Sequence, residues 1–222
     1  MTSLSLLQLV SPALPVGAFS YSEGLEWLVQ NGRLQDEASL SAWLEAELLR
    51  GQVGIEAAAL LSIRQCLEKW RAGVDQAAVI RDWSAWLLAL RDAPELRAQQ
   101  AQMGRSLLQL LKDLGHPLPN DDLQLAWPIA WAWAGMVWEL PALDVAQGYL
   151  YGWVANQLSA AVRLVPLGPT QAQRLQQQLL PLIESRALAS MKQDPQSLWC
   201  GGVGAAMAQL SHAELYSRLF RS

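Results

Sequence analysis

The sequence predicts an all-α protein, a single-domain bundle of roughly ten helices, on the strength of three observations. β-branched residues, which strands favour, are scarce, with 12 Val, 5 Ile and 2 Thr among 222 residues. No segment alternates apolar and polar residues with the period of two that a half-buried strand shows. Apolar residues recur instead every three or four positions, which is the spacing of one helix face. We expect one domain over residues 1–222, because no linker or fixed-period repeat divides the chain.

Capping residues mark the expected helices in the first half of the chain. Ser20 followed by Glu23 matches a capping box, and Asn31-Gly32 is a typical helix end. Asp36 is expected to cap the helix that follows, which has an apolar stripe. Three more boundaries are expected: an Asp75 cap, a helix start at Asp92-Ala93-Pro94-Glu95, and a helix end at Gly115.

The second half contains the most apolar segment, residues 123–140. Pro128 interrupts it, and it is shorter than the ~20 apolar residues that span a membrane, so we expect the buried central helix of a soluble protein. A long helix should follow over residues 142–164. After it we expect a rigid turn at Pro166–Pro169 and a further helix that Thr170 caps and Pro181 kinks. A flexible break at Gly201–Gly204 and a capping box at Ser211–Glu214, which would open a short last helix, complete the expectations.

The composition excludes several classes of protein. The chain is 52% hydrophobic and 16% charged, with a net charge of −4, so it can bury a large core and is an unlikely nucleic-acid binder. The N-terminus lacks the charged and apolar regions of a signal peptide, and we expect a cytoplasmic protein. There are 11 Trp, and 13 of the 16 basic residues are Arg. Because both types are enriched at protein interfaces, we expect a homo-oligomer or a heterocomplex.

The sequence offers no assembled catalytic site. It lacks the G-x-x-x-x-G-K-[ST] motif of a phosphate loop, and Gly201–Gly204 follows no strand. Cys66 and Cys200 could pair with His116 or His212, but no third orienting group is evident. We therefore expect no catalytic residues and no tight metal site, although a symmetric dimer could form a weak, transient one. Asp121-Asp122 fits a helix N-terminus better than an acid/base pair.

Three segments carry candidate partner-binding residues. Residues 6–26 form a Pro- and Gly-stiffened apolar loop that leads into a helix, and loops of this kind either pack well or carry function. Residues 159–168 place Arg163 at a helix end, where it could simply complement the helix dipole. The tail combines two charges with two apolar side chains that could enter a partner groove, or it could be a disordered end. The candidates are Ser20, Tyr21, Glu23, Arg163, Tyr216, Arg218, Leu219, Phe220 and Arg221.

These segments resemble the UreF family of urease accessory proteins. The matching stretches are Ser11-Pro12-x-Leu14-Pro15-Val16-Gly17-x-Phe19-Ser20-Tyr21-Ser22-x-Gly24-Leu25-Glu26, Glu95-Leu96-Arg97 with Gln102–Leu108, Ala161–Gly168, and Tyr216–Ser222. They occur in family order along nearly the whole chain. Ala18, Gln100 and Pro169 depart from the pattern, and Pro169 could alter the turn after Arg163.

The resemblance implies an all-α homodimer that is not an enzyme. Such a dimer binds the accessory protein UreD, called UreH in some systems, and together they recruit the GTPase UreG. The complex loads nickel into apo-urease in a GTP-dependent reaction, so nickel is handled by the complex. Arg163 would act as an arginine finger or, as we expect, with Tyr21 as a gatekeeper of hydrolysis, and residues 211–222 would dock UreD. The alternative is a helical interaction scaffold unrelated to urease.

Overall fold

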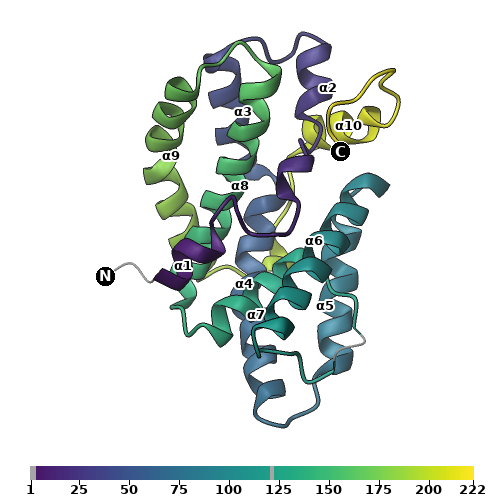
Figure 1. The fold of residues 1–222 in the computed structure, drawn as a ribbon, viewed down its shortest axis with the longest axis vertical. Helices are drawn as coiled ribbons and strands as arrows, with labels where there is room; N and C mark the ends of the chain where they lie inside the picture. The colour runs from purple at the N-terminus through teal and green to yellow at the C-terminus, as the bar shows by residue number, and fades with distance from the viewer. Residues whose placement is uncertain (1–3, 121–122) are drawn as a thin grey trace.

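The computed structural model describes residues 4–120 and 123–222, and within these ranges the fold is entirely helical (Figure 1). The α-helices are α1 (Leu4–Leu9), α2 (Leu25–Gln30), α3 (Glu37–Arg50), α4 (Gln52–Arg71), α5 (Ala77–Ala89), α6 (Pro94–Asp113), α7 (Trp127–Val137), α8 (Ala142–Leu164), α9 (Pro169–Ser190) and α10 (Val203–His212). Two short 3₁₀ helices, η1 (Ala18–Ser20) and η2 (Pro195–Ser197), complete the set. The predicted all-α class is confirmed.

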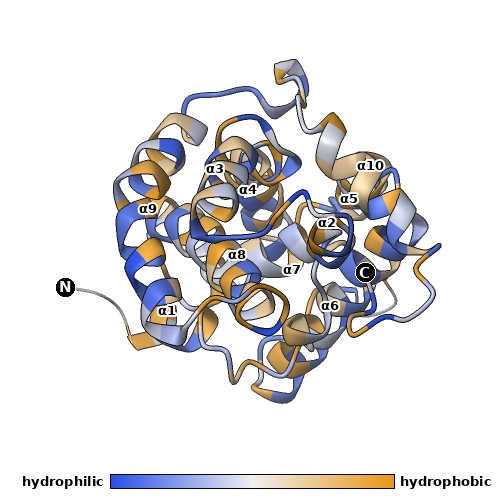
Figure 2. Ribbon diagram, turned by 90° about the horizontal axis from the view of Figure 1, so that it is seen from above, coloured by the Kyte–Doolittle hydropathy of each residue, from blue (hydrophilic) through white to orange (hydrophobic). Residues whose placement is uncertain are grey.

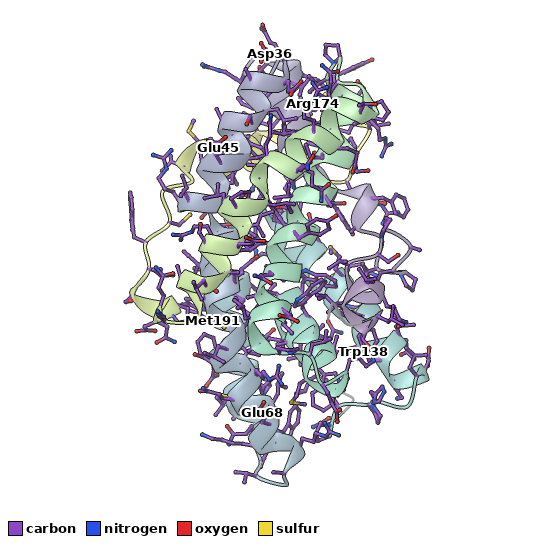
Figure 3. The ribbon with its side chains drawn as sticks, turned by 90° about the vertical axis from the view of Figure 1, so that its left-hand side faces the viewer. Asp36, Glu45, Glu68, Trp138, Arg174 and Met191 are labelled. Carbon is purple, nitrogen blue, oxygen red and sulfur yellow. The ribbon has the colours of Figure 1, made fainter. Side chains whose placement is uncertain are left out.

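Helix α4 lies at the centre of the bundle and packs against α3, α5, α7, α8 and α9. Its first half, from Val53 to Leu60, is buried on every side, which suits a run of small and apolar residues. Asp36 at the start of α3 and Glu68 near the end of α4 lie at opposite ends of the molecule (Figure 3). The α3–α4 pair therefore spans the long axis, with α8 and α9 on one side and α5, α6 and α7 on the other.

The apolar segment at residues 123–140 contains α7, whose residues Pro128 to Met136 are all buried. Of the two roles expected for Pro128, a helix start or a kink, the structure shows the start, and Leu140-Pro141 separates α7 from α8 as expected. Helix α8 has the predicted bounds. In the described part of the chain, no helix is both long and apolar enough to cross a membrane.

Several predicted boundaries are confirmed and others are wrong. Asp36 caps α3 through a reciprocal capping box with Ser39. The N-cap of α5 is Gln76 and not Asp75, although the Asp75 side chain accepts a hydrogen bond from the Ala77 N–H. Helix α6 begins with Pro94 after Ala93, and it ends just before Gly115, which has a φ of 88°. The Asp121-Asp122 pair lies outside the described residues.

The errors cluster near the chain ends and at α9. The N-cap of α9 is Gly168 and not Thr170. Pro169 occupies the first turn of the helix, where the missing N–H has no partner to lose, so it does not disrupt the turn after Arg163. Pro181 lies inside α9, and the kink expected there stays a prediction. The expected break at Gly201–Gly204 is instead the start of α10, and the expected capping box at Ser211–Glu214 is its end.

The predicted capping box at Ser20 and Glu23 is also wrong. Ser20 belongs to η1, and Glu23 and Gly24 both have positive φ angles, of 53° and 87°. Helix α2 starts only at Leu25, with Gly24 as its N-cap. The Glu23 side chain turns into the protein, because a buried arginine and an indole N–H are its partners there.

Candidate partner-binding site

The three predicted segments meet at Arg163, near the end of α8. Its Nη1 donates a hydrogen bond of 3.4 Å to the main-chain oxygen of Phe19, in η1. The centre of its guanidinium lies 4.5 Å from the centroid of the Phe220 ring, a cation–π contact. One exposed arginine thus joins the N-terminal loop to the tail. This contact goes beyond a simple interaction with the dipole of α8.

The tail, residues 213–222, is held along the N-terminal loop by main-chain hydrogen bonds. The Arg221 N–H donates to the Ser20 oxygen at 2.8 Å. The main-chain oxygen of Ser222 accepts from the N–H groups of Ser22 and Glu23 at 2.7 and 3.0 Å, and from the Ser22 hydroxyl at 2.7 Å. The tail is therefore docked on its own chain. In Figure 1 it lies beside α2 and α10, at the opposite side of the bundle from α9.

A buried charge cluster lies beneath this loop. The Arg91 side chain, 3% exposed, forms an ion pair of 2.5 Å with Glu56 and lies 3.9 Å from Glu23. The Tyr149 hydroxyl donates to Glu56 Oε2 at 2.7 Å, and the Trp153 indole donates to Glu23 Oε2 at 3.0 Å. These contacts compensate the buried charges of Glu23, Glu56 and Arg91, which would otherwise destabilise the folded state.

Burial sets the pKa values of this cluster. It raises the pKa of Glu56, and Arg91 opposes that shift. Burial alone would lower the pKa of Arg91, but the carboxylates of Glu56 and Glu23 outweigh it and hold that pKa above its usual value. Burial and the Glu56 charge together keep the pKa of Tyr149 well above 10.0. Arg91 therefore stays charged, and Tyr149 stays a donor.

The tail is linked to the charge cluster through Gln99 of α6. The Ser222 hydroxyl donates to Gln99 Oε1 at 2.7 Å, and Gln99 Nε2 donates to Glu23 Oε1, also at 2.7 Å. The tail and the core charges therefore share one hydrogen-bond network. Sequence reasoning missed Glu56, Arg91 and Gln99, although a lone acid in the run of small and apolar residues after Gly54 was a usable signal for a buried partner.

The predicted site residues divide by exposure. Tyr216 is fully exposed and Leu219 is 53% exposed, so both present apolar surface to solvent. The side chains of Arg163, Arg218 and Arg221 are also exposed, and Ser20 is half-buried. Three other candidates, Tyr21, Glu23 and Phe220, are buried. In this conformation those three support the tail and the loop, and their direct contact with a partner stays a prediction.

Exposed apolar residues extend from the tail onto α10. Val203, Met207 and Leu210 follow one another at helical spacing on its outer face, and Trp199 precedes them at 84% exposure. No residue from 199 to 211 is charged. Figure 2 shows α10 coloured mainly toward the hydrophobic end of the scale. A grouped apolar surface of this kind is typical of a protein–protein contact.

A cavity of about 630 Å³ lies between the N-terminal loop and α8. Its lining includes Arg163, Phe19 and the charge cluster but neither a cysteine nor a histidine. Its two carboxylates, Glu23 and Glu56, are engaged by the hydrogen bonds described above. Across residues 4–120 and 123–222, no group of three or more His, Cys, Asp or Glu side chains could hold a metal ion.

The fold and this site define a class of protein. An all-helical domain with an ordered tail, grouped exposed apolar residues and a rim of arginines is typical of a protein-interaction component.

Comparison with known proteins identifies the family. The family model described as UreF matches residues 34–180. A urease accessory protein UreF from Prochlorococcus marinus (strain MIT 9312) is 36% identical over 228 residues, covering 100% of both chains. Those of Microcystis aeruginosa and Nostoc sp. are each 40% identical, covering 99% of this chain and 97% and 95% of their own. The chain belongs to the UreF family of urease accessory proteins.

Proposed function

We propose that this chain is a non-enzymatic component of urease maturation that acts in the cytoplasm. With UreD (or UreH) and the GTPase UreG, it enables the GTP-dependent insertion of nickel into apo-urease, and nickel is the cargo of the complex. The observation that carries this proposal is similarity over nearly the full length to proteins described as urease accessory protein UreF. The same similarity argues against a helical scaffold unrelated to urease.

The surface around the tail supports a role in assembly. Tyr216, Leu219 and the outer face of α10 together offer apolar side chains without a charged residue between positions 199 and 211. We propose that this region and the tail dock UreD, and that the protein works as a homodimer. The exposed arginines beside the apolar residues would orient the partner through directional hydrogen bonds.

The position of Arg163 supports a gatekeeping role more than that of an arginine finger. A finger must reach the transferred phosphoryl group, whereas this guanidinium is engaged by Phe19 and Phe220. We propose that Arg163 and the loop that contains Tyr21 contact the GTPase only when the tail is docked. In this way they would determine when GTP is hydrolysed.

The test is urease activity in nickel-fed cells that carry the urease gene cluster, with and without this chain. Loss of activity at normal amounts of apo-urease is expected, and unchanged activity without a second gene copy would refute the proposed function. Arg163→Ala should also lower activity and change GTP hydrolysis by the assembled complex. The matched control is Arg174→Ala, which removes another exposed arginine, on α9 (Figure 3).

Docking of UreD is tested with point variants of exposed residues. Deletion of residues 211–222 would also remove His212 and Phe220 from the interior, so it would confound folding with binding. The double variant Tyr216→Ala/Leu219→Ala should weaken capture of UreD by at least about tenfold without changing stability. Leu188→Ala, which truncates a similarly exposed leucine on α9, is the control. Equal capture by both variants would refute the assignment of the tail.

A further inference from the structure

The cavity between the N-terminal loop and α8 has the size and the walls of a small-molecule site. Its volume of about 630 Å³ lies within the range of about 300–1,000 Å³ that is typical of ligand pockets. Residues of the N-terminal loop, α6, α8 and α9 line it. Its walls are mainly apolar, and the aromatic side chains of Phe19, Trp127 and Trp131 contribute to them. Such walls suit a ligand with an apolar body.

Gly152, in the middle of α8, keeps part of this cavity open. A glycine inside a helix makes the helix less stable than an alanine would. At Gly148, one turn earlier, packing requires the glycine, because an added methyl group would lie 2.9 Å from Cδ1 of Leu6. At Gly152 the nearest described atom to an added methyl group is Cη2 of Trp131, at 3.9 Å, which is an ordinary van der Waals contact. Packing therefore does not require a glycine at position 152, and the space beside it is available to a ligand.

Two buried glutamines of the lining each leave one amide atom without a partner. Gln100 on α6 is 4% exposed, and Gln176 on α9 is 6% exposed. Within the described part of the chain, neither Oε1 of Gln100 nor Nε2 of Gln176 has a hydrogen-bond partner. The other amide atom of Gln100, Nε2, faces Glu56 at 3.4 Å, so the oxygen is the atom left over. Buried polar atoms are normally paired, and these two therefore offer a ligand one acceptor and one donor.

The charged residues of the lining favour an uncharged ligand. Glu23, Glu56 and Arg91 interact with one another, and all four carboxylate oxygens already accept hydrogen bonds. Arg163, the remaining charged residue of the described lining, is exposed and already contacts Phe220. An ion would lose its hydration inside the cavity without gaining a free counter-charge, which makes its burial unfavourable.

We propose that this cavity binds a small uncharged molecule that combines an apolar body with a hydrogen-bond donor and an acceptor. The donor of the ligand pairs with Gln100 Oε1, its acceptor pairs with Gln176 Nε2, and its body packs against the aromatic walls beside Gly152. A primary amide on an aromatic ring is the simplest group of this class. This inference goes beyond the proposed function. Its test involves no partner protein, so its outcome is independent of the role in urease maturation.

The test uses benzamide, benzoate and benzamidinium, three probes of nearly equal size that differ in charge and in hydrogen-bonding groups. Their binding to the purified full chain at pH 7 is measured by ligand-observed NMR. Benzamide should bind at least about tenfold more tightly than either ion, because benzoate lacks the donor, benzamidinium lacks the acceptor, and both are charged. Absence of benzamide binding, or binding of either ion as tight as that of benzamide, would overturn the proposal.

Two pairs of variants locate the bound probe. Gly152→Leu fills the cavity and should weaken benzamide binding by at least about tenfold, whereas Gly204→Leu adds the same side chain at an exposed position of α10 and should have no effect. Gln176→Leu removes the free donor and should weaken binding by about tenfold, whereas Gln177→Leu, an exposed neighbour outside the cavity, should not. Thermal unfolding checks that each variant is folded, and Gln176→Leu keeps the test decisive if Gly152→Leu is not. Benzamide binding that is unchanged in the folded cavity variants would contradict the assignment.

Discussion

Replacing Arg91 with methionine tests the buried charge cluster most directly. The variant keeps an unbranched apolar side chain but leaves Glu56, which is 1% exposed, without its cation. Removing one partner of a buried ion pair typically lowers the free energy of unfolding by about 3–5 kcal/mol. This destabilisation has an upper limit, however, because Glu56 can take up a proton instead of staying charged.

The upper limit of the destabilisation can be calculated from the ordinary pKa of 4.5 for glutamate. At pH 7, which is 2.5 units above this pKa, protonating Glu56 costs about 3.4 kcal/mol at about 1.36 kcal/mol per unit. At pH 5.5 the same step costs only about 1.4 kcal/mol. The native state of Arg91→Met then binds one more proton than the unfolded chain, so its stability falls as the pH rises. We expect the destabilisation to be about 2 kcal/mol larger at pH 7 than at pH 5.5.

The assay is urea-induced unfolding of both proteins at the two pH values. The double variant Glu56→Gln/Arg91→Met should recover part of the stability at pH 7 and should show a smaller pH dependence than Arg91→Met, because position 56 can no longer take up a proton. Arg174→Met controls for removal of any arginine. A loss of stability in Arg91→Met that is equal at pH 5.5 and pH 7 would refute the reasoning, because Glu56 would then be neutral in the unchanged chain as well.

Two further predictions concern stability. Burial raises the pKa of Glu47 to about 7, against the opposing charge of Arg91, so the stability of the unchanged chain should fall between pH 4.5 and pH 7. Glu47→Gln should increase the free energy of unfolding at pH 8.5 by up to about 3 kcal/mol and have little effect at pH 4.5, and an equal effect at both would contradict this origin. Gly24 has a φ of 87°, and a methyl group there would lie 2.9 Å from the Gln209 nitrogen in α10. Gly24→Ala should therefore cost about 1–3 kcal/mol and increase proteolysis after α10, whereas unchanged thermal unfolding would contradict the close approach.

Local patterns predicted the parts of the fold that depend on neighbouring residues. The bounds of α8 follow from Pro141 before it and from the end of its apolar stripe, and Asp36 caps α3 as expected because its partner, Ser39, is three residues away. Helix class needed only periodicity and the scarcity of β-branched residues. These signals do not depend on how distant segments pack.

The errors arose where a distant residue supplies the partner. Ser20 and Glu23 match the capping-box pattern, but the Glu23 carboxylate contacts Arg91 and Trp153 instead of the helix N-terminus. A buried carboxylate without a cation nearby would destabilise the fold. The tail was expected to face a partner, and no local rule could show that Phe220 is covered by Arg163 from α8. Sequence reasoning named three separate segments, and only the packing shows that they form one site.

The short turn from Glu23 to Glu26 connects the tail to the core by two routes. Glu23 joins the Arg91 cluster and, through Gln99, reaches the end of the tail, whereas Glu26 binds the tail directly beside His212. The positive φ angles of Glu23 and Gly24 allow both carboxylates to face inward from neighbouring turns of the chain. A partner that displaced the tail would therefore leave buried acceptors of both glutamates unsatisfied, at a cost of about 1–3 kcal/mol for each group. Binding that preserves the docked tail avoids this cost, and so the docked conformation is the one that a partner should select.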